Sequence, residues 1–421
     1  MKITLSEFEA CLEGVTFPLA VAVSGGMDSL ALLLLAHEFA QKRGSYVIGL
    51  TVDHGVRPES KEEASRVGQW AQERGIQHVI LEWVGDKPLS RLQEKARKAR
   101  YALLTEWCKQ YQISTLLLGH HQQDQEETFW LRLSSGSGLD GLAGMKAQVV
   151  RDGVVFLRPL LDIPKERIKE TLVGKNQEWI EDPSNQTPHF FRGRLRHFFH
   201  EEGLSPPRLL QVMKKLQLDA DFIQESLKKA IETTVQVHNN GYLTVDKKSF
   251  NELHPAISKR VLAFLVQWFS NTDYAPRSTQ VIGILDKIKK ESPFTAGGIY
   301  WTSSREEIFL SREKRAIKDA FVVSQLHEKT LWDQRFWIDP RLSHYVSKES
   351  VIGALGSVPG LKKELTTSVL PRAWPTLPAL WEKGKVVAIP HLCYDILKCG
   401  KDLRKFIYLK TLFHDSLRFT I

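Results

Sequence analysis

The stretch 19–29 constrains the fold of this 421-residue chain more than any other segment. Residues 19–23 are small, apolar and partly β-branched, which predicts a strand buried on both faces. The run 30–36 is too long and too rich in Leu and Ala for a strand, so it predicts a buried helix. Between them, Gly25 and Gly26 give the turn backbone freedom and leave room for a ligand. A glycine loop at a helix N-terminus aims N–H groups outward and suits an anion.

The loop itself reads Ser-Gly-Gly-Met-Asp-Ser at 24–29. No lysine follows the glycines, which excludes a P-loop, and the glycines lack the spacing of dinucleotide binders. An ordinary strand–turn–helix corner is the alternative interpretation. The pattern Ser-Gly-Gly-x-Asp-Ser resembles the pyrophosphate-binding loop of the N-type ATP pyrophosphatases, the PP-loop superfamily, which cleave ATP to AMP and pyrophosphate. That resemblance implies ATP binding by Ser24, Gly25, Gly26, Met27, Asp28 and Ser29.

The rest of the front half alternates strands with helices. Strands are expected at 46–52, 78–82, 114–119 and 157–161, and helices at 61–74, at 89–110 and near Gln125. This alternation predicts an α/β fold with a doubly wound parallel sheet, whose ligands bind at the carboxyl ends of the strands.

The back half has a different pattern. Helices are expected at 208–236 and within 255–290, a hairpin at 297–310, and β-structure from about 331. Linkers are expected at Pro206-Pro207 and at 312–315. We therefore expect three domains: a PP-loop ATP-binding domain at 1–200, a mainly helical domain at 205–312, and a small β-rich C-terminal α+β domain at 325–421.

The net charge of +9 is unevenly distributed. Residues 1–188 carry 22 Lys and Arg against 25 Asp and Glu, whereas residues 189–421 carry 36 against 24. A balance of −3 in front and +12 behind predicts a polyanionic partner for the back half. A basic solvated surface is the alternative explanation.

Composition excludes several classes of protein. The first ten residues lack the apolar core of a signal peptide, and no apolar run approaches membrane-spanning length, so a cytoplasmic protein with no membrane partner is expected. The four cysteines form no Cys-x-x-Cys pair and have no metal-ligand spacing. Buried free thiols are therefore expected at Cys11, Cys108, Cys393 and Cys399.

A second informative segment is 119–128, Gly-His-His-Gln-Gln-Asp-Gln-Glu-Glu-Thr. Asp124 and Glu127 lie three residues apart, so they share one helix face, with His120 one turn earlier. Two carboxylates beside a nucleotide can bind a metal, accept a proton or hold a cation. The alternative is an acidic first turn that complements the helix dipole.

Several segments together resemble the tRNA(Ile)-lysidine synthetase family. The segments that carry the resemblance recur in the family's order at 24–29, 53–57, 96–101, 120–128, 158–161 and 181–185. The resemblance covers about the first 196 residues, and the back half matches only loosely, chiefly at 377–381 and 387–390. One residue departs from the pattern, because this chain has Gly193 where the family has Asn between two arginines.

The resemblance implies modification of the wobble cytidine, position 34, of tRNA(Ile) with a CAU anticodon. ATP activates the C2 oxygen as an adenylate, and free L-lysine then displaces AMP to give lysidine, so that the tRNA reads AUA instead of AUG. ATP and Mg²⁺ are the cofactors that this chemistry implies. The enzyme would be a ligase that forms a carbon–nitrogen bond, of class EC 6.3.4.19.

The same resemblance assigns roles to individual residues. Asp28 would ligate Mg²⁺, and Asp124 and Glu127 would receive the lysine ammonium group, with either of them as the base. The implied catalytic residues are Asp28, Arg97, Asp124 and Glu127. Further ATP contacts are implied at Asp53, His54 and His120, and tRNA contacts at Arg100, Arg192, Arg194 and Arg196. The resemblance also makes 1–200 the catalytic domain and 205–312 a tRNA-binding domain, and it implies a tRNA contact for the domain at 325–421.

Other functions stay open at this point. A PP-loop enzyme that thiolates tRNA would need a persulfide-carrying cysteine or an iron–sulfur cluster. An amidating enzyme would need an ammonia source, and the sequence has no attached glutaminase motif. A catalytically inactive tRNA-binding relative is a third possibility, which intact Asp28, Asp124 and Glu127 disfavour. The sequence does not predict the oligomeric state, and a homodimer stays open.

Overall fold

The computed structural model describes residues 1–55, 59–85, 92–181, 206–270, 275–333, 335–357, 371–392, 394–395 and 403–409. The chain divides into two compact units, Met1–Ala220 (unit 1) and Asp221–Ile421 (unit 2). Among the described residues, no helix combines the length and the apolar character that crossing a membrane requires.

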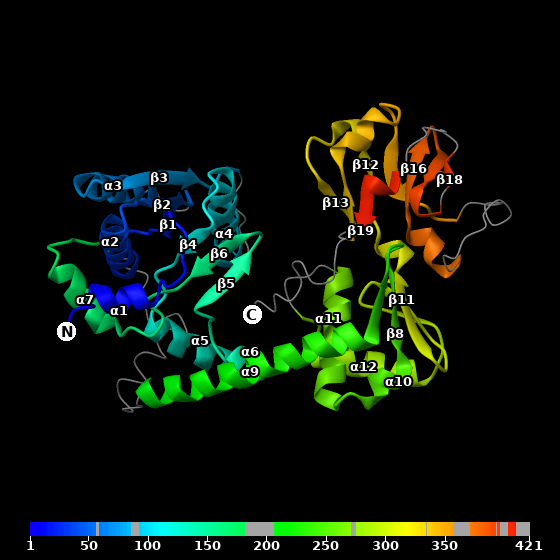
Figure 1. Ribbon diagram of the computed structural model, residues 1–421, viewed down its shortest axis with the longest axis horizontal. Coiled ribbons are helices and arrows are strands. Elements are labelled where there is room, and N and C mark those ends of the chain that lie inside the picture. The colour runs from blue at the N-terminus through cyan, green and yellow to red at the C-terminus, as the bar shows by residue number, and fades with distance from the viewer. Residues whose placement is uncertain are drawn as a thin grey trace. The chain divides into compact units, whose positions relative to one another are not determined.

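Unit 1 alternates strands and helices (Figure 1). Its helices are α1 (Leu5–Ala10), α2 (Met27–Lys42), α3 (Ser60–Glu73), α4 (Leu92–Gln110), α5 (Gln122–Ser134), α6 (Leu139–Leu142), α7 (Lys165–Val173) and the first part of α9 (Pro206–Thr234). Its strands are β1 (Leu19–Ala22), β2 (Val47–Asp53), β3 (Gln77–Glu82), β4 (Thr115–Leu117), β5 (Gln148–Arg151) and β6 (Val154–Leu157).

These six strands form one sheet in the order β3-β2-β1-β4-β6-β5. All neighbouring pairs are parallel except β5–β6. The chain adds β2 and β3 on one side of β1 and then returns to place β4 and β6 on the other side. The predicted doubly wound parallel sheet is therefore confirmed, with its topological switch point between β1 and β4, where such sheets bind ligands.

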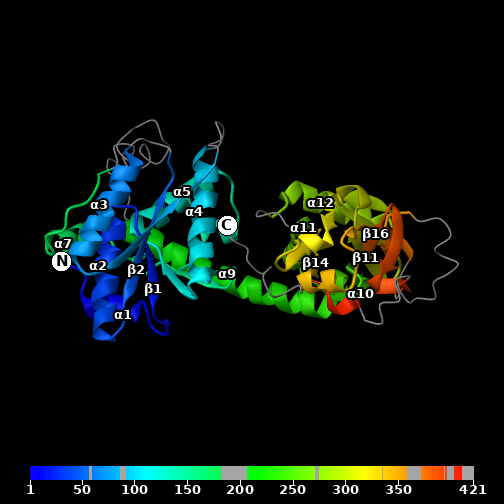
Figure 2. The ribbon, with the colours of Figure 1, turned by 90° about the horizontal axis from the view of Figure 1, so that it is seen from above.

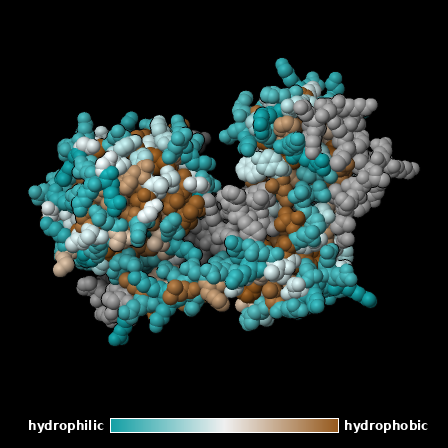
Figure 3. Space-filling model, in the orientation of Figure 1, coloured by the Kyte–Doolittle hydropathy of each residue, from teal (hydrophilic) through white to brown (hydrophobic). Residues whose placement is uncertain are grey.

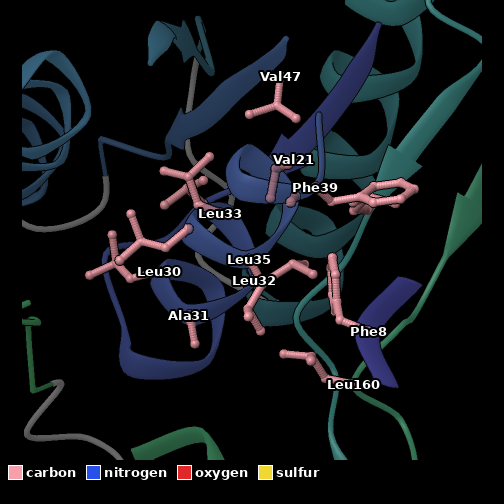
Figure 4. Packing of buried hydrophobic residues seen from close by; sticks show 14 of the residues in the cluster. Phe8, Val21, Leu30, Ala31, Leu32, Leu33, Leu35, Phe39, Val47 and Leu160 are labelled. Carbon is pink, nitrogen blue, oxygen red and sulfur yellow. The ribbon is translucent and has the colours of Figure 1, made fainter. Parts of the chain in front are cut away.

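Side chains of β1 point alternately to two apolar layers, which explains why the strand reads as continuously apolar. Leu19 and Val21 pack with the leucines of α2, whereas Ala20 packs with Leu104 and Trp107 of α4. Figure 2 shows α2 and α3 on one face of the sheet and α4 on the other, and Figure 4 shows the layer around α2. Each leucine buried there contributes about 1.5–3 kcal/mol, so α2 is firmly anchored below its N-terminal loop.

The strand expected at residues 157–161 was placed wrongly, because the strand of this region, β6, ends at Leu157. The structure has a hairpin of β5 and β6 instead, and the chain turns away from the sheet after Leu157. Asp152 and Gly153 form the turn, both with positive φ, at 48° and 84°. An Asp-Gly pair between two apolar runs favours such a tight hairpin, and this is the signal that the sequence analysis missed.

Unit 2 contains the rest of α9 and three antiparallel sheets. Its other helices are α10 (Lys247–Glu252), α11 (Pro255–Ser270) and α12 (Ser278–Lys289). The first sheet has the order β7 (Val235–His238), β8 (Tyr242–Asp246), β11 (Glu307–Arg312), β10 (Ile299–Ser303), β9 (Phe294–Ala296). The second has the order β12 (Phe321–Val322), β15 (Val351–Ala354), β16 (Pro378–Glu382), β17 (Lys385–Ile389), β18 (Tyr394–Asp395), and the third is β13 (Thr330–Trp332), β14 (Phe336–Ile338), β19 (Ile407–Leu409).

The expected helices of the back half and its C-terminal β-structure are both present. The helices are accompanied by a five-stranded sheet, of which the sequence analysis expected only the β10–β11 hairpin. A fully buried arginine, Arg335, joins the parts of unit 2: it donates to the carbonyl oxygens of Gly241 and Thr376 and pairs with Asp333. The division of unit 2 near 312–325 stays a prediction.

Helix α9 is divided between the two units, and its first part, up to Ala220, packs on the rest of unit 1. Met213 is buried, and Gln217 donates to the carbonyl oxygen of Ala143 at 2.8 Å. The space-filling view shows hydrophobic side chains along α9 (Figure 3), where Leu218 and Phe222 are exposed. Unit 1 therefore extends beyond the boundary expected near residue 200.

Candidate functional site

The predicted nucleotide loop joins β1 to α2 at the switch point of the sheet. Gly25 adopts a φ of +84°, which favours glycine, and a Cβ there would lie 2.7 Å from Ile180 and 2.9 Å from Val67. The Gly25 carbonyl oxygen also accepts a hydrogen bond from the Ile180 amide at 2.9 Å. Glycine at this position thus serves both the turn and the close contact with the segment before residue 182.

Hydrogen bonds within the loop fix its shape. The Ser29 hydroxyl accepts from the Ser24 amide at 3.1 Å and donates to the Gly26 carbonyl oxygen at 2.9 Å. Gly26 caps α2 without a side-chain hydrogen bond, so no side chain caps the N–H groups of the first turn. Those N–H groups and the helix dipole favour an anion such as a phosphate.

The segment after β4 lies directly against this loop. A Cβ on Gly119 would lie 3.2 Å from backbone atoms of Asp28 and Ser29, so the two segments approach closely. Two residues further along, the buried His121 has its Nε2 3.5 Å from Asp28 Oδ2 and 3.6 Å from Asp124 Oδ2. His121 therefore bridges the nucleotide loop and the acidic helix α5.

The hydrogen bonds of His121 define its tautomer. Nδ1 accepts from the Gln123 amide at 3.2 Å, so the ring proton lies on Nε2, which faces both carboxylates. Burial alone would lower the pKa of His121, but the Asp28 and Asp124 carboxylates outweigh it and raise the pKa above its usual value. The Nε2–H group of His121 therefore lies beside both carboxylates and links them.

The N-terminal cap of α5 helps to position the acidic residues of this helix. Asp124 Oδ2 accepts from the His121 amide at 3.0 Å in a capping box, while Glu127 is only 4% exposed. Burial raises the pKa of the neighbouring Glu126, although its hydrogen bond from Gln122 opposes the shift. Buried carboxylates in this arrangement can receive an ammonium group or accept a proton.

Asp28 has the properties of a magnesium ligand. Its Oδ1 atom is buried and has no hydrogen-bond partner in the part of the chain that the structure describes, so one oxygen has unused acceptor capacity there. The described residues contain no group of three or more potential ligands that could hold a metal. Magnesium in nucleotide sites is usually bound by one or two carboxylates together with substrate phosphates, so a site at Asp28 fits.

Asp53 and His54 follow β2, the strand beside β1. Asp53 Oδ1 accepts from the Gly55 amide at 2.8 Å and from the Ser60 hydroxyl at 2.7 Å. Burial would raise the pKa of Asp53, but these hydrogen bonds outweigh it and lower the pKa. His54 lies edge-on to Trp83 at 6.1 Å. Both residues lie at the expected edge of the sheet, and Asp53 already shapes the turn into α3.

On the other side of the switch point, arginines gather around Tyr101 of α4. The guanidinium groups of Arg97 and Arg151 lie over its ring at 5.1 and 5.0 Å. Arg158 lies close enough to Tyr101 for electrostatic interaction with it. Arg100 is close enough to Tyr101 and Arg97 to interact electrostatically with both. We call Arg97, Arg100, Arg151 and Arg158 the arginine cluster.

His120 lies beside the arginine cluster. Burial lowers the pKa of His120 to about 3, and the charges of Arg158, Arg97 and Arg100 add to the effect. The imidazole is therefore neutral at pH 7. Its Nδ1 atom is buried without a hydrogen-bond partner, although the residue as a whole is partly exposed. That nitrogen is available to a ligand at the carboxyl end of β4.

The structure thus brings the loop, Asp53, His54, His120, Asp124 and Glu127 to one edge of the sheet, with Arg97 and Arg100 beside them. Arg192, Arg194 and Arg196, like Gly193, lie outside the described residues. Sequence reasoning assigned no role to His121, Tyr101, Arg151 or Arg158. Three of them had a signal, because Tyr101, His121 and Arg158 lie inside the motifs at 96–101, 120–128 and 158–161.

Comparison with known proteins gives the same assignment for most of the chain. The PP-loop domain family matches residues 8–202. The tRNA(Ile)-lysidine synthase of Wolbachia sp. subsp. Brugia malayi is 34% identical over 385 residues, which cover 89% of each chain. That of Ruegeria pomeroyi is 32% identical over 88% of each chain, and that of Rhodopseudomonas palustris is 47% identical over 42% of this chain and 52% of its own. The chain therefore belongs to the tRNA(Ile)-lysidine synthase family.

Proposed function

We propose that this protein uses ATP to join free L-lysine to C2 of the wobble cytidine of tRNA(Ile) with a CAU anticodon. The observation that carries this proposal is the bridge from His121 to Asp28 and Asp124. It connects a loop suited to pyrophosphate with an acidic pair, the partly exposed Asp124 and the buried Glu127, suited to an ammonium group. A nucleotide and a lysine could therefore be held at neighbouring positions in one site.

The first step would be adenylation of the tRNA. N–H groups of the loop and of α2, with Ser24, would bind the phosphates of ATP, and Asp53, His54 and His120 would complete the nucleotide site. The C2 oxygen of the cytidine would attack the α-phosphorus, and the bond to pyrophosphate would break. Asp28 would hold Mg²⁺, which when bound neutralises charge on the departing pyrophosphate. Arg97 would stabilise negative charge on the adenylate.

The second step would be attack by lysine. Asp124 and Glu127 would bind the ε-ammonium group, and one of them would accept its proton. The free amine would then attack C2, and the bond from C2 to the adenylate oxygen would break, with the electron pair leaving on AMP. Because Glu127 is almost fully buried, its charge would act in a medium of low dielectric constant, where it counts for more than in water.

Binding of the tRNA would involve both halves of the chain. The +12 balance of residues 189–421 would attract the phosphate backbone, and Arg100 would contact it near the active site. We retain Arg192, Arg194 and Arg196 as proposed tRNA contacts. The oligomeric state, including a homodimer, stays open.

The cysteines of the front half do not favour thiolation. Burial raises the pKa of the Cys108 thiol to about 12, so it would not form a thiolate at neutral pH. Cys11 is exposed, contrary to expectation, and burial around its sulfur together with Asp162 and Glu7 raises its pKa as well. A persulfide carrier needs the opposite environment, with a lowered thiol pKa.

Release of pyrophosphate tests the proposal directly. The full-length protein with ATP should release pyrophosphate only when tRNA(Ile) is present, and AMP should appear when lysine is added. Asp28→Asn should reduce the rate more than tenfold, which corresponds to about 1.4 kcal/mol of barrier. The control is Asp162→Asn, which removes a surface carboxylate paired with Lys214. Pyrophosphate release without tRNA, or a fully active Asp28→Asn variant, would contradict the proposal.

A further inference from the structure

The arginine cluster concentrates positive charge around Tyr101 of α4, and its member Arg158 lies at the edge of the sheet where the proposed active site is. Arg158 directly follows β6 and His120 follows β4, and these strands are adjacent and parallel. Helix α4, which carries Arg97 and Arg100, packs against β6 (Figure 1). Arg151 reaches the same tyrosine from the turn end of the β5–β6 hairpin, where it pairs with Val154. Segments far apart in the sequence thus place two guanidinium groups over one ring, with Arg100 and Arg158 near enough to interact with it electrostatically.

These charges have no acidic partners within the described part of the chain. None of the four arginines forms an ion pair with a carboxylate there, whereas Arg167 and Arg335 each have one. Gathering cations without counterions costs electrostatic energy, which a bound anion would recover. The gathering itself is therefore a sign of an anionic ligand.

One member of the arginine cluster is deeply buried with an unused donor. Arg158 is only 7% exposed and donates from NH1 to the Lys146 carbonyl oxygen at 2.8 Å. Its Nε atom is buried and has no hydrogen-bond partner among the described residues. An orphaned donor on a buried guanidinium is unfavourable unless a ligand accepts from it.

Tyr101 gives this cluster a defined shape. Its ring packs on Phe156 of β6 at 5.6 Å, so the ring is fixed to the sheet. The guanidinium groups of Arg97 and Arg151 lie over that ring, and Arg97 also reaches the hydroxyl at 3.4 Å. Cation–π contacts of this kind align guanidinium planes at small entropic cost.

We propose that Arg100, Arg151 and Arg158 form a phosphate-binding site for the sugar–phosphate backbone of the anticodon loop, beside Arg97, which would face the adenylate. Tyr101 holds the guanidinium groups of the arginine cluster in place. This inference rests on the proposed function for its ligand. Arginine forks match phosphate oxygens, and several arginines match a chain of phosphates better than the single carboxylate of lysine. The phosphates of ATP are less suitable ligands for this cluster, because the N-terminus of α2 would already bind them.

Binding of labelled tRNA(Ile) to the full-length protein, without ATP or lysine and at several salt concentrations, tests the site. Arg151→Gln should weaken binding about tenfold, on the scale of one charge-assisted hydrogen bond. It should also make the log–log salt slope shallower by about 0.7–0.9. Affinity for a non-hydrolysable ATP analogue should not change.

Two matched variants separate this site from the effect of net charge. Arg43→Gln removes the same charge from an arginine stacked on Phe39 at the opposite end of α2, and it should leave tRNA binding unchanged. Tyr101→Leu removes no charge but should weaken tRNA binding, whereas Tyr101→Phe keeps the ring and should bind almost like the parent. Circular dichroism would verify that each variant is folded.

Three other outcomes would contradict the proposal, and each has a different meaning. Equal tRNA binding by Arg151→Gln and Arg43→Gln would show that the arginine cluster is not a tRNA site. A loss confined to the ATP analogue, or to lysine, would assign the cluster to that substrate instead. A parent protein that binds no tRNA(Ile) would instead contradict the proposed function itself.

Discussion

Glu127 combines almost complete burial with a position one helical turn from Asp124. Replacing it with Gln keeps the shape of the side chain but removes the charge that would bind an ammonium group. Glu127→Gln should therefore weaken the use of lysine far more than the binding of ATP. The expected result is that adenylated tRNA accumulates normally without lysine, while lysidine formation falls at least tenfold.

The matched control is Glu38→Gln, a glutamate of α2 paired with Lys175 away from the site. It should leave both steps unchanged. If adenylation fails in Glu127→Gln as severely as the complete reaction does, then Glu127 belongs to the ATP site and its assignment to lysine is wrong.

In unit 2, Asp339 should make stability depend on pH. Hydrogen bonds from the side chain and amide of Arg341, opposed by burial, lower the pKa of Asp339 to about 2. A carboxyl with a lowered folded-state pKa stabilises the fold above its unfolded pKa of about 3.9, and this contribution disappears as pH falls toward 2. Asp339→Asn should therefore narrow the stability difference between pH 5 and pH 2, as measured by urea unfolding. An unchanged difference would mean that the ion pair does not contribute.

At the scale of the residue, the sequence proposes which acids and glycines form the site but does not predict which of them lie in contact. Spacing along α5 is enough to pair Asp124 with Glu127, because a helix repeats every 3.6 residues. The contact from His121 to Asp28 joins positions 93 residues apart, so it depends on the order of strands in the sheet. The same limit applies to Arg151 and Arg158, which only the β5–β6 hairpin brings to Tyr101.

At the scale of the element, helix α2 offers a paired test of the loop. Gly25 and Gly44 flank this helix, and both have positive φ, at 84° and 65°. A Cβ at Gly25 would clash with Ile180 and Val67, whereas a Cβ at Gly44 meets nothing within 4 Å. Gly44→Ala should therefore cost only the backbone strain, about 1–2 kcal/mol, and Gly25→Ala a further 1–3 kcal/mol or so.

Urea unfolding of unit 1, monitored by near-ultraviolet circular dichroism, would measure the loss of stability in Gly44→Ala and in Gly25→Ala. Gly25→Ala should also lose ATP binding, because the loop would have to shift away from Ile180. Equal destabilisation by the two substitutions would show that the contact between the loop and Ile180 is loose in solution.

The elements of unit 1 were easier to predict than those of unit 2. Strands β1, β2 and β3 lie within about one residue of their expected positions, because strands buried on both faces read as continuous apolar runs. Strand β6 was misplaced because the apolar run continues past Leu157 into the turn. In unit 2 the strands are short, and their pairing depends on long-range contacts such as those of Arg335, for which no local pattern exists.

At the scale of the whole molecule, the uneven charge predicts a division of labour. A fragment that contains only the front half tests this division. Because Met213 and Gln217 pack on the rest of unit 1, the fragment should end at Ala220 rather than near Glu202. Residues 1–220 should fold and bind ATP but should bind tRNA(Ile) much more weakly. Its log–log salt slope should be shallower than that of the full chain, by about 0.7–0.9 for each phosphate that the fragment no longer neutralises. Equal slopes would place the main phosphate contacts in unit 1.

The central claim is that the C2 oxygen of the wobble cytidine leaves on AMP when lysine replaces it. The most direct measurement uses tRNA(Ile) that carries a heavy oxygen isotope at C2 of that cytidine, together with ATP, lysine and the full-length protein. Mass spectrometry should find the heavy oxygen in AMP, and the digested tRNA should contain a nucleoside with the mass of cytidine plus lysine minus water. Heavy oxygen retained in a nucleoside that has gained lysine, or AMP formed without the label, would contradict the account.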